Sequence, residues 1–240
     1  MAKAIRSWRP CWSRVARPTR KPKPRRLKLR RPLPRRSNVT QASIRLVIGL
    51  GNPGAEYTET RHNAGFWFCE RLARELGVSF SKESRFQGWA ANVRQGGQNL
   101  WLLMPATFMN RSGQAVRALA QFYRILPSEM LVIHDELDLP PGQMRLKFGG
   151  GLGGHNGLKD ITSHLGTQDF WRLRLGIGHP GDRNEVVNYV LKPARREEQE
   201  EIDAAMDRAL LAWTDIARGE MEAATRKINS KPTPAKKENP

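Results

Sequence analysis

The chain of 240 residues contains only two cysteines, Cys11 and Cys69. Neither belongs to a Cys-x-x-Cys pair, so the sequence indicates no disulfide framework and no thiolate metal site. Cys69 recurs with apolar residues at helical spacing, which is typical of a small buried hydrophobe. The sequence also lacks an apolar run of the roughly 20 residues that a membrane span requires. We therefore expect a cytoplasmic protein with no membrane partner.

Acidic residues are absent from the first 42 positions, which hold 15 Lys or Arg residues interspersed with proline. Such a segment cannot bury enough apolar surface to offset its chain entropy. We predict a disordered basic extension over residues 1–43 and a second disordered tail over residues 231–240. The extension could be a phosphate-binding arm, an organelle transit segment or translated upstream sequence, and we favour the last.

The charge of the remainder is close to balanced. Of the 41 Lys and Arg residues in the chain, 26 lie beyond position 42 and face 23 acidic residues. Composition alone therefore does not identify the remainder as a nucleic-acid-binding protein, although clustered cations could still make it one.

From Ile44 onward, strand-like and helix-like patterns alternate. Strands are predicted at residues 45–50, 88–94, 99–104, 130–134, 143–148 and 172–178. Helices are predicted from about residues 58–61 to Leu76, over 112–124 and 156–165, and as one long helix spanning Ile202 to Ile216. This pattern predicts a single α/β domain over residues 44–230, with a twisted mixed β-sheet covered by helices on both faces.

The motif GLGNPG at residues 49–54 matches the dinucleotide-binding pattern of three glycines. That pattern needs a helix opening at its third glycine and an acidic residue at the end of a second strand. Here Pro53 disfavours helical backbone at Asn52, and the candidates Glu70 and Glu75 fall inside a helix. A dinucleotide-dependent oxidoreductase is therefore only a weak alternative.

Polar residues follow several predicted strands, where the loops of an open α/β sheet gather ligands. Asn52, Asn110 and Asp135 should converge there. His62 lies near the start of the first helix, where a neutral imidazole is favoured, and could act as a base oriented by Asp135. The alternative, that His62 is a polar residue satisfied by backbone at the helix start, has nearly equal weight.

The other polar residues are weaker candidates. His134 is expected in the core, and His164 and His179 are expected to be structural. Glu136 and Asp138 are expected to be solvated or to cap a turn.

Patterns of several enzyme classes are missing from the sequence. It contains no Gly-x-Ser-x-Gly, no His-Glu-x-x-His and no cysteine beside a histidine motif. We expect neither a metal nor a cofactor, which leaves direct attack by an activated water.

A glycine-rich segment at residues 149–157 lies between two pairs of cations. Arg145 and Lys147, like Arg172 and Arg174, are two positions apart, so each pair projects from one face of the sheet. These cations could form a phosphate clamp, and a solvated face is the alternative.

Together the motifs resemble the bacterial-type peptidyl-tRNA hydrolase family. The resemblance covers about residues 44–228 and follows, in order, GLGNPG, TRHNAG, PATFMNRSG, HDELDLPPG, GGGLGGHNGLKDI and RLRLGIGHPGD. It implies a monomeric enzyme with a single α/β domain, which hydrolyses the ester bond between peptide and tRNA. Organellar relatives that bind RNA as intron-splicing cofactors provide a second possible function on the same fold.

The resemblance also implies roles for individual residues. His62 would be the general base, Asp135 would orient it, and Asn110 would hold the water or the developing oxyanion. Substrate-binding residues would be Asn52, Tyr57, Met109, His155 and Asn156. The tRNA phosphate would be bound by Arg145, Lys147 and Arg174.

Overall fold

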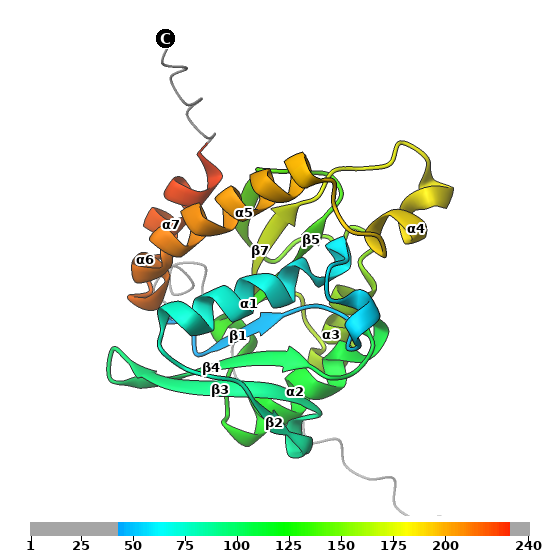
Figure 1. Cartoon of the computed structure of the whole chain (residues 1–240). Coiled ribbons are helices and arrows are strands. Elements are labelled where there is room, and N and C mark those ends of the chain that lie inside the picture. The colour runs from blue at the N-terminus through cyan, green and yellow to red at the C-terminus, as the bar shows by residue number, and fades with distance from the viewer. Residues whose placement is uncertain (1–42, 231–240) are drawn as a thin grey trace, which may run out of the picture. The chain divides into compact units, whose positions relative to one another are not determined.

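A computed structural model describes residues 43–230, so the predicted extensions at residues 1–42 and 231–240 lie outside the described part of the chain. The described residues form one seven-stranded sheet with the order β2-β3-β4-β1-β5-β7-β6, around which the helices are arranged (Figure 1). The strands are β1 (Leu46–Gly49), β2 (Ser81–Glu83), β3 (Gly88–Gln95), β4 (Gln98–Pro105), β5 (Met130–Glu136), β6 (Met144–Phe148) and β7 (Trp171–Gly176).

The sheet is mixed, as the sequence predicts. Strand β1 runs parallel to β4 and β5, and β5 runs parallel to β7. The hairpin of β3 and β4 and the edge strands β2 and β6 supply the antiparallel pairs. The carboxyl ends of β1, β4, β5 and β7 therefore lie at one edge of the sheet, where α/β proteins bind ligands.

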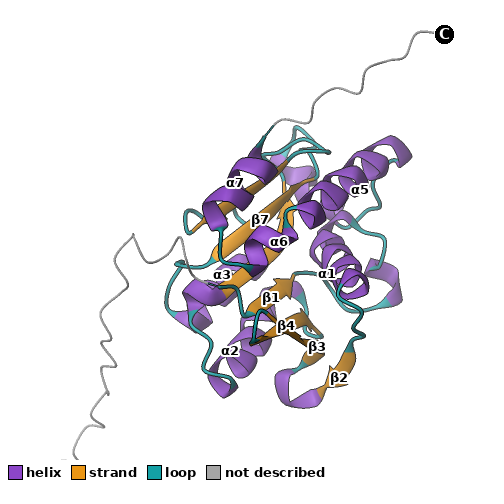
Figure 2. Cartoon of the chain, turned by 90° about the vertical axis from the view of Figure 1, so that its left-hand side faces the viewer, coloured by secondary structure: helices purple, strands orange, loops and turns teal. Residues whose placement is uncertain are grey.

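Each face of the sheet is covered by its own helices, which are seen on both sides of the strands in Figure 2. Alternation along the central strands divides the core, because Val47 belongs to one cluster whereas Leu46 and Ile48 belong to the other. The first cluster packs against α1 (Ala64–Glu75), α5 (Arg196–Leu211), α6 (Trp213–Ala217) and α7 (Met221–Asn229). The second packs against α2 (Ser112–Phe122) and α3 (Asn156–Leu165). The predicted fold class is confirmed.

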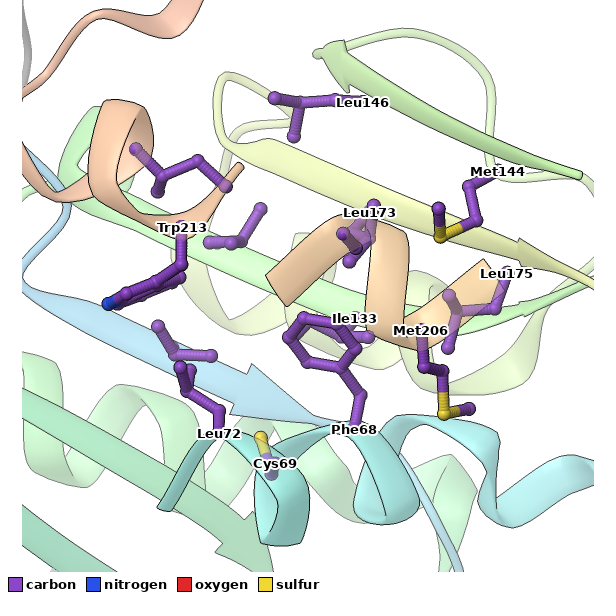
Figure 3. Packing of buried hydrophobic residues seen from close by; sticks show 14 of the residues in the cluster. Phe68, Cys69, Leu72, Ile133, Met144, Leu146, Leu173, Leu175, Met206 and Trp213 are labelled. Atoms are coloured by element: carbon purple, nitrogen blue, oxygen red, sulfur yellow. The ribbon is translucent and has the colours of Figure 1, made fainter. Parts of the chain in front are cut away.

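The first cluster is shown in Figure 3, where Phe68 of α1 lies beside Ile133 of the sheet and Leu72 points toward Trp213 of α6. Cys69 is fully buried in this cluster, and burial raises the pKa of its thiol. The cysteine is therefore the small apolar residue that its helical spacing predicts.

Two helix predictions are wrong in detail. The first helix begins at Ala64, after short 3-10 turns at η2 (Ala55–Tyr57) and η3 (Arg61–Asn63), so His62 lies before the helix. The predicted long helix is broken at Ala212, where the backbone N–H bonds the carbonyl of Ala209 three residues back. The turns, the short strand β2 and the five-residue helix α4 (Val186–Val190) carry too few residues to be predicted, and α7 was also missed.

Gly65 brings the start of α1 directly onto the strand ends. A Cβ atom at this position would collide with the backbone of Leu50 and with the carbonyl of Ile133. The close approach is possible only without a side chain, and it places η3, with His62, above the end of β5. The fold thus positions a histidine from one segment over a carboxylate from another.

No helix within residues 43–230 combines the length and apolar character needed to cross a membrane.

Candidate active site

Asp135 is the centre of the site. It lies at the end of β5 and is only 4% exposed. Its Oδ1 atom lies 3.0 Å from the Nδ1 atom of His62, within hydrogen-bond distance. Burial opposes ionisation of this carboxyl, but two neighbouring imidazoles hold its pKa well below the usual range. The carboxylate is therefore ionised and available to orient a base.

His62 and His134 both contact Asp135, yet their environments differ. Burial lowers the pKa of His62, but the charge of Asp135 and the hydrogen bond to it outweigh burial and raise that pKa above 6.5. His134 is 2% exposed and bonds only the backbone oxygen of Asp135, and burial lowers its pKa to about 3. His134 is thus a neutral core residue, as the sequence predicts, whereas His62 can change its protonation state near neutral pH.

The Asp135 carboxylate also dictates the tautomer of His62. An ionised carboxylate can only accept, so the Nδ1 atom of neutral His62 carries the proton and donates it to Asp135. The Nε2 atom of His62 then holds the free lone pair. His62 lines a cavity of about 1140 Å³ together with Asp135. This arrangement has the geometry of a general base beside a substrate space.

His155 is a second imidazole bound to the same carboxylate oxygen, with its Nε2 atom 3.0 Å from Asp135 Oδ1. The family resemblance implied only a substrate-binding role for His155. It does line the cavity, but the contact with Asp135 was missed because nothing in the sequence links residues 135 and 155. Only the fold brings the start of α3 against the end of β5.

These three side chains also have the composition of a metal site. One ligand atom from each of His62, Asp135 and His155 lies within 4.8 Å of the others. Hydrogen bonds already account for the geometry, because each imidazole can donate one proton to the carboxylate. The expectation of no metal and no cofactor stays a prediction.

Asn52 is buried beside the cavity and organises it. Its Oδ1 accepts from the backbone N–H of Met109 at 2.8 Å, which fixes the loop that carries Asn110. Asn63, which the sequence analysis overlooked, exchanges hydrogen bonds of 2.8 and 3.0 Å with the backbone of Asn52. The loops after β1 and β4 and the η3 turn therefore form one rigid unit.

The remaining residues assigned to the substrate differ in their positions. Met109 is buried and lines the cavity, together with the exposed side chains of Asn110 and Asn156. Tyr57 does not line it but packs edge-to-face against Phe108, with ring centroids 6.4 Å apart. Tyr57 therefore lies behind Phe108, an exposed residue that lines the cavity and was not among the predicted site residues.

One wall of the cavity is apolar and comes from α4 (Val186–Val190) and the residue after it. Val187 and Leu191 are 65% and 37% exposed there. Solvent-exposed aliphatic side chains at the mouth of a polar site are suited to an extended ligand with apolar groups. The pattern of α4 is too short to have been recognised in the sequence.

Arg61 fastens this wall to the η3 turn. The guanidinium is buried and donates to the carbonyls of Tyr189, Lys192 and Pro193, at 3.2, 3.2 and 2.8 Å, and to Glu198 at 2.6 Å. The residue next to His62 is thereby tied to the segment that follows α4. A buried guanidinium with this many acceptors is a fixed structural element.

Charged residues near the cavity also depart from expectation. Glu136 was expected to be solvated, but it is 8% exposed and accepts from Arg174 Nε at 2.7 Å. It also caps a turn, as predicted, through the N–H of Asp138. His179, expected to be structural, lines the cavity, whereas His164 bonds the carbonyl of Asp160 within α3.

The cations of β6 and β7 lie opposite one another, with Arg145 facing Arg174 and Lys147 facing Arg172. Directly opposed residues share one face of a sheet, so all four side chains start from the same face. Arg172 is 2% exposed and holds the carbonyl of Gly151 at 2.7 Å, which makes it a support for the glycine loop. The expectation of a four-cation clamp is therefore wrong for Arg172.

The other three cations differ in what they already bind. Arg145 donates to the carbonyl of Asn229 at 2.9 Å, and Arg174 is paired with Glu136. Lys147 is exposed, and none of the ion pairs found among residues 43–230 involves it. Lys147 is the cation best able to receive a phosphate.

Comparison with known proteins gives consistent similarities. The sequence model of the family described as peptidyl-tRNA hydrolase matches residues 46–237. A peptidyl-tRNA hydrolase of Aromatoleum aromaticum is 73% identical over 198 residues, which cover 82% of this chain and 100% of that protein. One from Azoarcus sp. is 70% identical over 196 residues, covering 82% and 89% of the two chains.

Solved structures are similar as well. The crystal structure of peptidyl-tRNA hydrolase from Acinetobacter baumannii has a TM-score of 0.77 and 47% identity, and the match covers 79% of this chain and 96% of that one. A peptidyl-tRNA hydrolase in complex with N-propanol gives a TM-score of 0.78 at 46% identity, covering 80% and 98%.

Proposed function

Because the chain belongs to the peptidyl-tRNA hydrolase family, we propose that it hydrolyses the ester bond between peptide and tRNA, with His62 as the general base. The observation that carries this proposal is the 3.0 Å contact between His62 and the buried, ionised Asp135 at the edge of the cavity. The predicted cytoplasmic location forms part of the proposal, since the substrate arises in translation. The predicted monomeric state is proposed with it.

The reaction follows from the tautomer of His62. Its Nε2 atom removes a proton from a water molecule as the oxygen attacks the ester carbonyl, and Asp135 stabilises the imidazolium that forms. Collapse of the tetrahedral intermediate breaks the bond to the ribose oxygen, which takes the proton from His62. The products are a peptide with a free carboxylate and a tRNA with a free ribose hydroxyl.

Side-chain amides supply the polar environment for this step. Asn52 Oδ1 is occupied by the Met109 N–H, which leaves its amide group as a donor at the cavity. Asn110 lies in the loop that Asn52 fixes, and its amide donates to the oxygen on which negative charge develops. His155 and Asn156 line the cavity from the start of α3 and contact the substrate there.

The cations of β6 and β7 seat the tRNA. Lys147 and Arg174 bind phosphate, and Arg145, which lies directly opposite Arg174 on the same face of the sheet, contributes to the site. The Glu136–Arg174 pair uses only the Nε atom of the arginine in this structure, which leaves the end of its guanidinium for a ligand.

The test is turnover of an N-acylated aminoacyl-tRNA by wild type and by His62→Ala. Loss of the base should lower kcat by roughly 10² to 10⁴-fold. His164→Ala is the matched control, because this histidine lies outside the cavity lining and should keep kcat within about twofold.

Three results would contradict the proposal. Full turnover by His62→Ala would reject His62 as the base. Absence of turnover in wild type, with tRNA binding retained, would favour the RNA-binding alternative. Tight binding of a nicotinamide dinucleotide would revive the oxidoreductase alternative, although α1 begins at Ala64, well beyond the third glycine, Gly54.

A further inference from the structure

The imidazole of His155 is fixed in one tautomer by the helix that it precedes. Its Nδ1 atom accepts from the backbone N–H groups of Gly157 at 3.2 Å and Leu158 at 3.4 Å, so His155 is the N-cap of α3. An atom that accepts two N–H donors carries no proton of its own. In neutral His155 the proton must therefore be on Nε2, the atom that faces Asp135.

Asp135 consequently accepts two imidazole donors on a single oxygen. The Nδ1 atom of His62 and the Nε2 atom of His155 each lie 3.0 Å from Oδ1, and the two ring centroids are 5.1 Å apart. Each donor takes up part of the negative charge of the carboxylate and restricts its rotation. Without the second donor, the carboxylate would interact more strongly with His62 and would be held less firmly.

We propose that His155 is a positioning residue, which keeps the Asp135 carboxylate oriented toward His62. Its hydrogen bond also weakens the attraction between the carboxylate and the His62 imidazolium, so that the imidazolium can return its proton to the leaving ribose oxygen. This inference rests on the proposed function, because it assigns His155 a purpose only if His62 moves a proton. It differs from the substrate-channel role, because it acts through Asp135.

The same contact connects the glycine-rich loop to the base. His155 directly follows Gly153 and Gly154, which both have positive φ values, of 56° and 77°. Upstream, the loop is held by Arg172 at the carbonyl of Gly151. The glycine-rich loop is thus held at Gly151 by Arg172 and ends at His155, whose Nε2 atom is the donor that positions Asp135.

Substitution of His155 by two residues separates its two hydrogen bonds. In His155→Asn the amide oxygen replaces Nδ1 as the cap of α3, but the side chain is too short to reach Asp135. In His155→Gln the longer side chain places an amide donor where Nε2 lies. Both replacements are side-chain amides, and each keeps only one of the two kinds of hydrogen bond that His155 makes.

The measurement is an NMR titration of the His62 ring, assigned among the five histidines of the chain by its loss in His62→Ala. We expect the His62 pKa to move upward in His155→Asn and to remain near the wild-type value in His155→Gln. In His155→Asn the acid limb of the pH–kcat profile should therefore move to higher pH, together with the His62 pKa. At neutral pH kcat should fall roughly tenfold, the effect expected for one lost hydrogen bond to a charged group.

Other ionisable groups around His62 remain in place in both variants. Besides Asp135 and His155, those that line the cavity are Arg111, Glu136, Asp138, Lys159, His179 and Arg183. Beneath the carboxylate, His134 stacks edge-to-face on His155, with centroids 5.0 Å apart. Because these groups are common to both variants, they cannot cause a difference in the His62 pKa between Asn and Gln.

The inference is overturned if the His62 titration in His155→Asn matches wild type or moves downward while His62→Ala is inactive. If His62→Ala retains full turnover, the proposed function itself has failed. A thermal unfolding curve for each variant shows whether the cap of α3 survives. His155→Ser, whose side chain can also cap α3 but cannot reach Asp135, provides the test if the Asn variant does not fold.

Discussion

Two regions of the molecule differ in how many of their polar groups already have a partner. One is the floor of the cavity, formed by Asp135, His62 and His155, and the other is the cation face, formed by Arg145, Lys147 and Arg174 on β6 and β7. At the floor, Asp135 is 4% exposed and both imidazoles that reach it have fixed orientations. On the cation face, Lys147 is exposed and Arg174 holds Glu136 through one nitrogen. The first region is built for a defined geometry, and the second has charge to offer to a ligand.

This difference agrees with the two parts of the proposed reaction. Proton transfer requires a base held within hydrogen-bond reach and a counter-charge that does not move. Burial of Asp135 and its two hydrogen bonds to imidazoles meet this requirement. Recognition of a long polyanion requires accessible cations, whose attraction is screened by salt. Substitutions at the floor should therefore change kcat, whereas substitutions on the cation face should change binding.

The strongest test of the floor is Asp135→Asn. The substitution keeps the shape but removes the charge that offsets burial of His62, so the pKa of His62 should fall below 6.5. This direction is opposite to that expected for His155→Asn. Since the imidazolium loses its partner, kcat should fall by roughly 10²-fold or more. Steady-state kinetics and the His62 titration measure the two effects.

Asp138→Asn is the matched control for this substitution. Asp138 is an exposed carboxylate that lines the same cavity, so the variant removes the same charge without touching either imidazole. We expect a change in kcat of less than about tenfold. Equal losses in the two variants would mean that Asp135 contributes only a general negative field.

The pH dependence provides the second test. The pKa of His62 is raised above 6.5, and only the neutral imidazole accepts a proton. The rate should therefore fall about tenfold per pH unit as the pH drops below that raised pKa. Stability should behave in the opposite way, because a raised histidine pKa stabilises the fold below pH 6.5 and loses this contribution as the pH rises through the folded value.

Activity and unfolding measured over the same pH range check this prediction. Wild type should gain rate and lose part of its stability on passing from below pH 6.5 to above the folded pKa. In Asp135→Asn the rise in rate should move to lower pH. The stability change should reverse its sign, because a His62 pKa below 6.5 destabilises the fold at low pH and this penalty disappears as the pH rises. A rate that is flat through this window would show that no group of this kind limits the reaction.

Much of this site could be predicted from local sequence. Short apolar runs predicted the strands, and polar residues just beyond them predicted that Asn52, Asn110 and Asp135 would meet at one edge of the sheet. Their approach follows from chain topology, which the alternation of strands and helices encodes. The contact between His62 and Asp135 was one of two alternatives of nearly equal weight at the level of sequence, and the structure shows it at 3.0 Å.

Other features depend on long-range contacts that no local pattern reveals. The bond between His155 and Asp135 arises because α3 begins against the end of β5, and the burial of Arg172 arises because the glycine loop folds back over it. Asn63 was missed because its partner is the backbone of Asn52, which leaves no trace in side-chain spacing. Spacing within one strand predicted which cations share a face but not which of them are covered.

The smallest expected effect is on the cation face. Lys147→Ala should weaken tRNA binding several-fold and reduce the slope of log K against log salt by about one, since one phosphate contact is lost. Lys82→Ala is the matched control, because Lys82 is an exposed lysine on β2, the strand at the opposite edge of the sheet. Its slope should equal that of wild type. Arg174→Ala is less informative, because it also leaves Glu136 without the guanidinium that it binds at 2.7 Å. If Lys147→Ala and Lys82→Ala have the same slope, the cations of β6 and β7 are a solvated surface, and the tRNA must be held elsewhere.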